Sequence, residues 1–168
     1  MVLKSISRFL DKFDLPWVLL ALITILIIVS TNSRKDFWRC FPVGIWTMVT
    51  GALLEQFFIK NKFWVEHFKM IKVGELDLFV IIGPFFAIGF LLIRFLPENR
   101  LAKFLAVLAW SGLATGIEFM AGKLGFLEYD SQKWSALHSL GIYYLSLMSA
   151  LGFYCIYNNH SNQHSDHR

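Results

Sequence analysis

The segment Leu101–Leu124, LAKFLAVLAWSGLATGIEFMAGKL, sets the class of this protein. It is mainly apolar and long enough to cross the hydrocarbon core of a bilayer as an α-helix, which takes about 20 residues. The whole chain has the same character, since 56% of its 168 residues are hydrophobic and 17% are charged. A small soluble domain cannot hide so much apolar surface from water. We therefore expect an all-α integral membrane protein, with the lipid bilayer as its first partner.

Four further apolar runs surround this segment. Pro16 and Pro42 stand where we expect the first turns of two of them, and there a missing N–H costs little. Gly83 and Pro84 lie inside a third run, where we expect a kink or local unwinding. The sequence predicts one transmembrane domain, residues 1–157, with spans at about 15–30, 41–59, 76–96, 101–124 and 134–157, then a polar tail at 158–168. The first run has an alternative interpretation as a signal peptide, although Val-Ser-Thr at 29–31 is a poor cleavage site.

Two segments outside the spans have apolar residues at helical spacing between charges. The linker Lys60–Glu75 carries Phe63, Trp64 and Phe68 in this way. We expect it to form an amphipathic helix on the membrane surface, between spans two and three. The segment before the first span has a similar apolar stripe and predicts a second interfacial helix.

The basic residues form short clusters between the apolar runs, as in loops that touch lipid head groups. The net charge of +4 therefore does not indicate a nucleic-acid partner. Nine Lys and Arg fall on the N-terminal side of the predicted membrane and seven on the other, so the orientation stays open. Cys40 and Cys155 are predicted near the same face. We interpret them as free thiols, and a disulfide is the alternative if that face is external.

Three ionisable residues lie inside the predicted spans at a similar depth. Glu55, Glu118 and His138 each stand five residues from a span end, or roughly 7–8 Å below the face. Asp77 is expected just above them. The candidate supporting residues are Gln56, Tyr129, Trp134 and Ser139. They predict a hydrated polar pocket near one membrane face, with capping or interhelical hydrogen bonds as the alternative.

The chemistry of such a pocket stays open. Two carboxylates and an imidazole can relay protons, hold a cation or bind a polar head group. No metal or other cofactor is predicted, because the ligand set is incomplete. Gly112 and Gly116 in the fourth span predict close packing of this helix against another, within the chain or in a homo-oligomer.

Residues spread over most of the chain carry a resemblance to a known family. They are the basic-aromatic run at 34–39, Phe41, Pro42, Glu118, Gly125, Tyr129, Trp134 and Ser139. The pattern resembles an uncharacterised family of small multi-pass membrane proteins of spore-forming Gram-positive bacteria. The resemblance implies a helical protein of the bacterial plasma membrane with no assigned reaction. It does not extend to Glu55 or His138.

Three kinds of function follow from these residues. The first is a non-enzymatic envelope component, such as an accessory, sensor or assembly partner. The second is a small transporter or a proton or cation pathway that uses the polar pocket. The third is a membrane-embedded enzyme acting on a lipid or isoprenoid, with Glu118 and His138 as acid and base. The sequence contains no nucleophile elbow, H-E-x-x-H motif or P-loop that would favour the third.

Overall fold

The computed structural model describes residues 16–31, 33–66, 70–130 and 133–165. The predicted interfacial helix before the first span lies outside these residues. Helices dominate the described chain, and four short strands join them. The helical elements are α2 (Pro16–Thr31), α3 (Arg34–Lys60), α4 (Leu78–Val80), the π-helix η1 (Ile81–Phe85), α5 (Phe86–Arg94), α6 (Arg100–Lys123) and α7 (Ala136–Ser165). The strands are β1 (Trp64–Glu66), β2 (Lys72–Val73), β3 (Leu76–Asp77) and β4 (Leu127–Tyr129).

Three of the described helices are long and apolar enough to cross a membrane: Asp36–Lys60, Arg100–Lys123 and Ala136–Asn158. The segments Trp17–Thr31 and Leu78–Arg94 are apolar but shorter. The expectation of a helical membrane protein is therefore supported. Three helices have the length and composition of membrane spans, and the predicted five spans are not confirmed.

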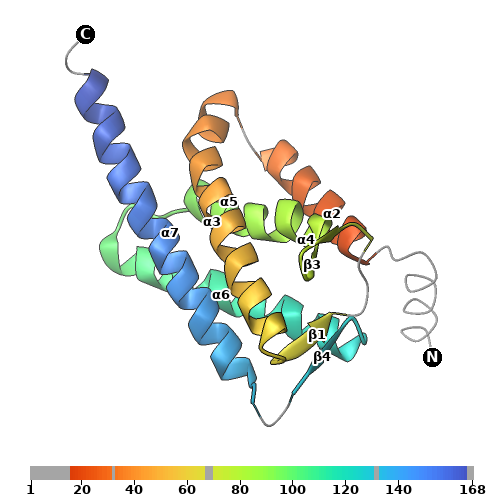
Figure 1. Ribbon diagram of the computed structural model, residues 1–168. Coiled ribbons are helices and arrows are strands. Elements are labelled where there is room, and N and C mark those ends of the chain that lie inside the picture. Colours follow the sequence, from red (N-terminus) through yellow and green to blue (C-terminus); the bar gives the residue numbers. More distant parts are fainter. Residues whose placement is uncertain (1–15, 32, 67–69, 131–132, 166–168) are drawn as a thin grey trace.

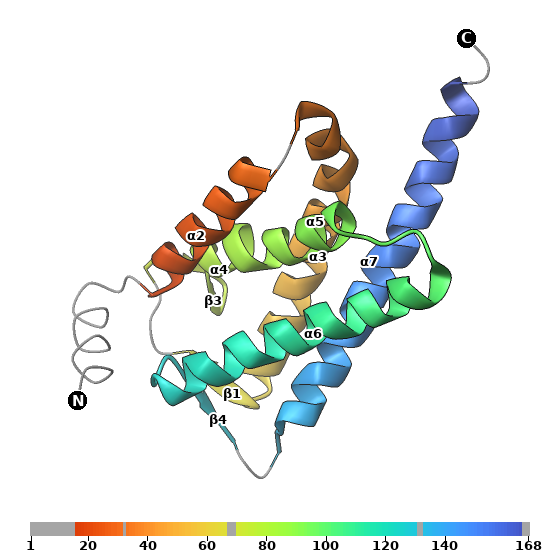
Figure 2. The same ribbon diagram turned by 180° about the vertical axis from the view of Figure 1, so that it is seen from behind.

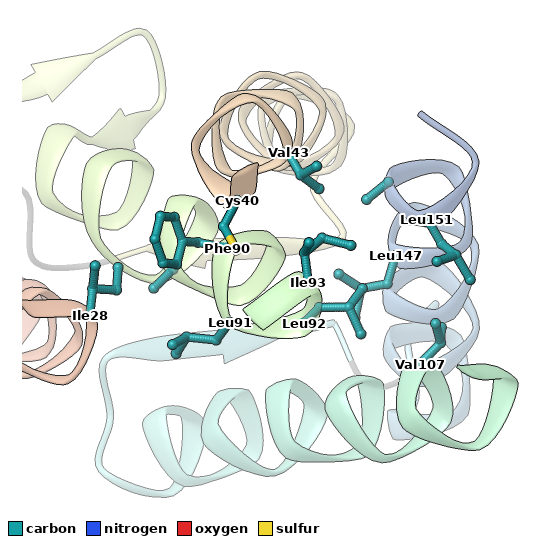
Figure 3. Close-up of a cluster of buried hydrophobic side chains, with 12 residues drawn as sticks. Ile28, Cys40, Val43, Phe90, Leu91, Leu92, Ile93, Val107, Leu147 and Leu151 are labelled. Carbon is teal, nitrogen blue, oxygen red and sulfur yellow. The ribbon is translucent and has the colours of Figure 1, made fainter. Parts of the chain in front are cut away.

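Helix α5 lies at the centre of the bundle. Six of its nine residues are buried, on all sides of the helix, which is typical of a helix enclosed by others. Its side chains share a buried cluster with Ile28 of α2, Val43 of α3, Val107 of α6 and Leu147 of α7. Figure 3 shows these helices arranged around α5. In Figure 1, α3 and α7 run the height of the molecule and β1 and β4 lie at its lower end.

The helix that leads into α5 is irregular. Residues Ile81–Phe85 form a π-helix that contains Pro84, so the distortion expected at Gly83 and Pro84 is found. Proline has no N–H to donate and disturbs the regular bonding of an α-helix, and a π-turn is one way to accommodate it. The segment begins at Leu78 rather than Leu76, because Leu76 and Asp77 form β3 and Asp77 caps α4.

The start of α3 differs from the prediction. The helix begins at Arg34, where the Ser33 side chain accepts a hydrogen bond from the backbone N–H of Asp36. Asp36 also pairs with Arg94 at 3.6 Å, which ties this end of α3 to the end of α5. Pro42 therefore lies inside the helix and not in its first turn.

Helix α7 continues to Ser165, so it extends into the segment predicted as a polar tail. Adding residues to an existing helix costs much less than nucleating one, so a polar sequence can continue it. Trp134 precedes α7 instead of opening it.

Both cysteines are free thiols; Cys40 is buried and Cys155 is exposed.

The predicted amphipathic helix in the linker Lys60–Glu75 is wrong. Helix α3 ends at Lys60, and Lys62 adopts a positive φ of 58° that breaks the helical path. Strand β1 then pairs with β4 in antiparallel fashion, with Trp64 opposite Tyr129. Strands β2 and β3 form a hairpin around Gly74, whose φ is 66°. A distant strand satisfies the β1 backbone groups, and local apolar spacing does not reveal such a partner.

Close helix packing occurs at other glycines than the predicted ones. A Cβ added at Gly44 would lie 2.6 Å from the Phe86 ring, and one at Gly83 would lie 2.6 Å from the Cβ of Ala21. A Cβ at Gly112 or Gly116 would meet nothing within 4 Å. The prediction that Gly112 and Gly116 pack closely against another helix is therefore wrong within the described chain. They lie on an exposed face of α6.

The contact at Gly83 predicts a selective loss of stability. In Gly83→Ala the new methyl group also meets the Ala21 backbone, with its Cα at 2.7 Å, so α2 has to move away from η1. We expect a loss of about 1–3 kcal/mol, measured as a lower melting temperature in detergent. Gly112→Ala is the matched control and should leave the melting temperature within error. Equal melting of the two variants would contradict the packing described here.

Candidate functional site

Glu118 on α6 is the centre of a polar network. Its Oε1 atom accepts hydrogen bonds from the Tyr129 hydroxyl and the Ser139 hydroxyl, both at 2.7 Å. The indole Nε1 of Trp134 donates to the Ser139 Oγ at 2.8 Å. Tyr143, one turn beyond Ser139 on α7, lines the same two pockets as Glu118. Hydrogen bonds to a charged acceptor are stronger than neutral ones, so this network holds the carboxylate in one orientation.

Glu55 on α3 is held by a residue from the strand pair. The Trp64 Nε1 donates to the Glu55 Oε1 at 3.0 Å. Trp64 stands directly opposite Tyr129 in the β1–β4 ladder, and Tyr129 donates to Glu118. One short ladder therefore positions a donor for each carboxylate. Figure 1 shows this ladder at the ends of α3 and α6.

An aromatic cluster covers this end of the site. It consists of Phe58, Phe63, Trp64 and Trp134. The Trp134 ring lies 4.7 Å from the Trp64 ring and 4.8 Å from the Phe58 ring, centroid to centroid. Such edge-to-face contacts add to the stability gained by burying the rings. The cluster fixes the indole groups that donate to Glu55 and Ser139.

The carboxylates of Glu55 and Glu118 lie between two pockets. A small one of about 50 Å³ is lined by Phe58, Trp64 and Trp134 of the aromatic cluster, together with Ser139. A larger cavity of about 280 Å³ is bordered by α2, η1, α5 and α6 and is mostly apolar. Glu55, Glu118 and Tyr143 line both. The arrangement presents an acceptor pair to an otherwise apolar space.

The Tyr129 phenol is a persistent donor. Its burial raises the pKa of Tyr129, and the negative charge of Glu118, which accepts its hydrogen bond, raises the pKa further. The hydroxyl group therefore stays protonated well into the alkaline range. Glu118 keeps this donor throughout the physiological pH range.

Two of the predicted pocket residues lie elsewhere. His138 is exposed, and its Nδ1 atom lies 3.0 Å from the Ser135 hydroxyl and accepts from the Ser135 backbone N–H at 3.2 Å. Asp77 is fully buried, but its carboxylate accepts from backbone N–H groups, at 2.8 Å from Phe79 and also from Met70. Both therefore hold local chain geometry and do not line the cavity.

Of the remaining predicted residues, three belong to the site and one lies elsewhere. Tyr129, Trp134 and Ser139 belong to the Glu118 network. The Gln56 side chain lies beside Gly74 in the β2–β3 turn, within about 3 Å of the place a Cβ would occupy there. In the described part of the chain, no group of three His, Cys, Asp or Glu is placed to hold a metal ion.

Sequence reasoning missed two residues of the site. Trp64 reaches Glu55 only because β1 pairs with β4, and no local pattern signals that pairing. Tyr143 had a usable signal, since it follows Ser139 by four residues and so lies on the same face of α7.

Removing one donor from Glu118 tests the network. Tyr129→Phe leaves a carboxylate with fewer hydrogen bonds, so we expect a loss of about 1–3 kcal/mol in the free energy of unfolding in detergent. Tyr157→Phe is the control, because Tyr157 is exposed and its ring stacking on Phe153 survives the change. Similar stabilities of both variants would argue against the network.

The raised pKa of Tyr129 predicts a pH dependence. Above about pH 10 an unfolded tyrosine ionises, whereas Tyr129 in the folded state stays protonated. The stability that its neutral form contributes is complete below that pH and decreases as the pH rises beyond it. The stability difference between the wild type and Tyr129→Phe should therefore narrow above about pH 10. A constant difference up to the alkaline limit would contradict this assignment.

Comparison with known proteins adds no information about the site. No protein-family model, curated protein or solved structure matches the chain. Function is therefore inferred from Glu55, Glu118 and the cavity that they line.

Proposed function

We propose that this membrane protein is a non-enzymatic envelope component that binds one amphiphilic molecule within the bilayer. The apolar part of the ligand occupies the cavity of about 280 Å³, and its polar end meets Glu55 and Glu118. The observation that carries the proposal is the presence of two carboxylates in the wall of one apolar cavity. The volume is near the lower end of the roughly 300–1,000 Å³ typical of small-molecule sites.

The site chemistry selects the polar end of the ligand. Ionised carboxylates accept hydrogen bonds and do not donate them. In a space of low dielectric constant they favour a hydroxyl or an amine and repel an anion. We therefore expect the ligand to carry a hydroxyl group or a cationic amine at the end of an apolar chain.

The cavity lining favours ligand binding over a transport pathway and over an enzyme. Acidic and phenolic side chains lie near the strands, whereas Ile27, Leu91 and Phe95 line the part of the cavity toward the other end. The acidic side chains that line the cavity lie at the strand end alone, which disfavours a transport path. Tyr129 and Ser139 already donate to Glu118, which favours a fixed acceptor over an acid or base that exchanges protons during a reaction.

The location belongs to the same proposal. The resemblance to small membrane proteins of spore-forming bacteria supports a multi-pass protein of the bacterial plasma membrane. The exposed side chains of Leu105 and Leu108 on α6 also support association with another membrane protein or a second copy of the chain. A ligand-binding protein of this kind fits a sensor or accessory role.

The proposal predicts selectivity for the head group. Octadecylamine, octadecanol and octadecanoate have the same chain and differ in their polar end. We expect the amine and the alcohol to bind the purified protein in micelles, measured by native mass spectrometry, and the carboxylate not to bind. Absence of binding for all three, or equal binding for all three, would overturn the proposal.

Variants of the two carboxylates locate the polar end. Glu55→Gln and Glu118→Gln should each weaken octadecylamine binding about tenfold, because each loses a charged acceptor. Glu98→Gln removes an exposed carboxylate from the loop before α6 and serves as the control. If all three variants bind the amine as the wild type does, the polar end lies elsewhere.

A further inference from the structure

A second apolar space adjoins the cavity. It is a groove of about 590 Å³ between α2 and α6, more open than the cavity. Five residues line both spaces: Trp17, Leu20, Leu113, Ile117 and Ala121. Figure 2 shows α2 and α6 on either side of α4 and α5. The two spaces therefore diverge from a shared wall.

Two glycines on α6, which have no side chain, leave the groove wide. Gly112 and Gly116 line it, and a Cβ at either position would meet no other atom within 4 Å. Leu19 and Ile23 of α2 form the opposite side. An apolar chain fits such a groove better than a polar segment does, because the lining offers few hydrogen-bonding groups.

Trp17 supplies an unused donor where the two spaces meet. Its side chain is 8% exposed and lines both the cavity and the groove. Its indole Nε1 is buried and has no hydrogen-bond partner among the described residues. A buried donor without an acceptor is unfavourable, so an oxygen atom supplied by a ligand would relieve this cost.

From these features we infer that the ligand is a two-chain glycerolipid with an uncharged, hydroxyl-bearing head group, of which diacylglycerol is the simplest. The inference rests on the proposed function and specifies its ligand. One acyl chain occupies the cavity and the second lies in the groove over Gly112 and Gly116. An ester carbonyl accepts a hydrogen bond from the Trp17 Nε1. The free hydroxyl group donates to the Glu55–Glu118 pair.

Each part of this lipid matches one feature of the site. The two apolar spaces accommodate two acyl chains, and an ester carbonyl oxygen supplies the acceptor that the buried Trp17 indole lacks. A phosphate group in the same position would place negative charge beside two carboxylates in a medium of low dielectric constant. A neutral head group is therefore favoured over an anionic phospholipid.

Lipid comparison tests the ligand class. Dioleoylglycerol should bind the full-length protein in micelles at least tenfold more tightly than monooleoylglycerol, which lacks the second chain, and more tightly than dioleoyl phosphatidate. The dialkyl ether analogue lacks ester carbonyls and should bind roughly three- to tenfold more weakly than dioleoylglycerol. Tighter binding of phosphatidate, or no preference for two chains, would overturn the inference.

Variants assign each part of the lipid to its place. The double variant Gly112→Leu/Gly116→Leu fills the groove and should reduce dioleoylglycerol binding to the level of monooleoylglycerol, while octadecanol binding is retained. In Trp17→Phe the preference for the ester over the ether lipid should disappear. Unchanged preferences in these variants would overturn the inference even where octadecanol still binds. Failure of octadecanol and octadecylamine to bind the wild type would instead overturn the proposed function.

Discussion

The enclosure of α5 governs the rest of the structure. This helix of nine residues has apolar side chains on every side, so it is stable only when α2, α3, α6 and α7 surround it. The ion pair between Arg94 and Asp36 and the hydrogen bond from Arg94 to the Thr31 carbonyl fasten its end to its neighbours. The π-helix before it contains Pro84 and packs closely against Ala21 of α2 at Gly83. The cavity lies beside Pro84 and Phe85 of this π-helix and beside α5.

The carboxylates impose a second requirement, since an acidic side chain inside a membrane bundle must find donors. The β1–β4 ladder meets it for both residues by placing Trp64 opposite Tyr129. The strands thereby contribute to the site although they are only three residues long. The donors fix each carboxylate at the cavity wall, and both residues also line the cavity on the side away from the aromatic cluster. Each carboxylate is therefore held by donors on one side and faces the cavity on the other, and this arrangement supports a binding role.

Counting along the sequence predicted a common depth for the polar residues, but it could not predict the direction in which each side chain points. Counting from span ends placed Glu55, Glu118 and His138 at one level. Depth along a helix says nothing about rotation around it, and His138 lies on an exposed face beside Ser135. The Asp77 side chain caps α4 and does not line the cavity. The glycines show the same limit: the spacing of Gly112 and Gly116 suggested close packing, and the structure gives that role to Gly44 and Gly83.

Apolar composition and run length alone identified a helical membrane protein, because lipid leaves few ways to satisfy a backbone. The sequence also located Glu118, because a charged residue is rare inside an apolar span, and named Tyr129, Trp134 and Ser139 as residues that support it. The fold added the pairing of β1 with β4, the central position of α5 and the mostly apolar cavity that Glu55 and Glu118 line. These features depend on contacts between residues far apart in the chain. Local patterns carry no record of such contacts, so they became visible only when the helices were packed together.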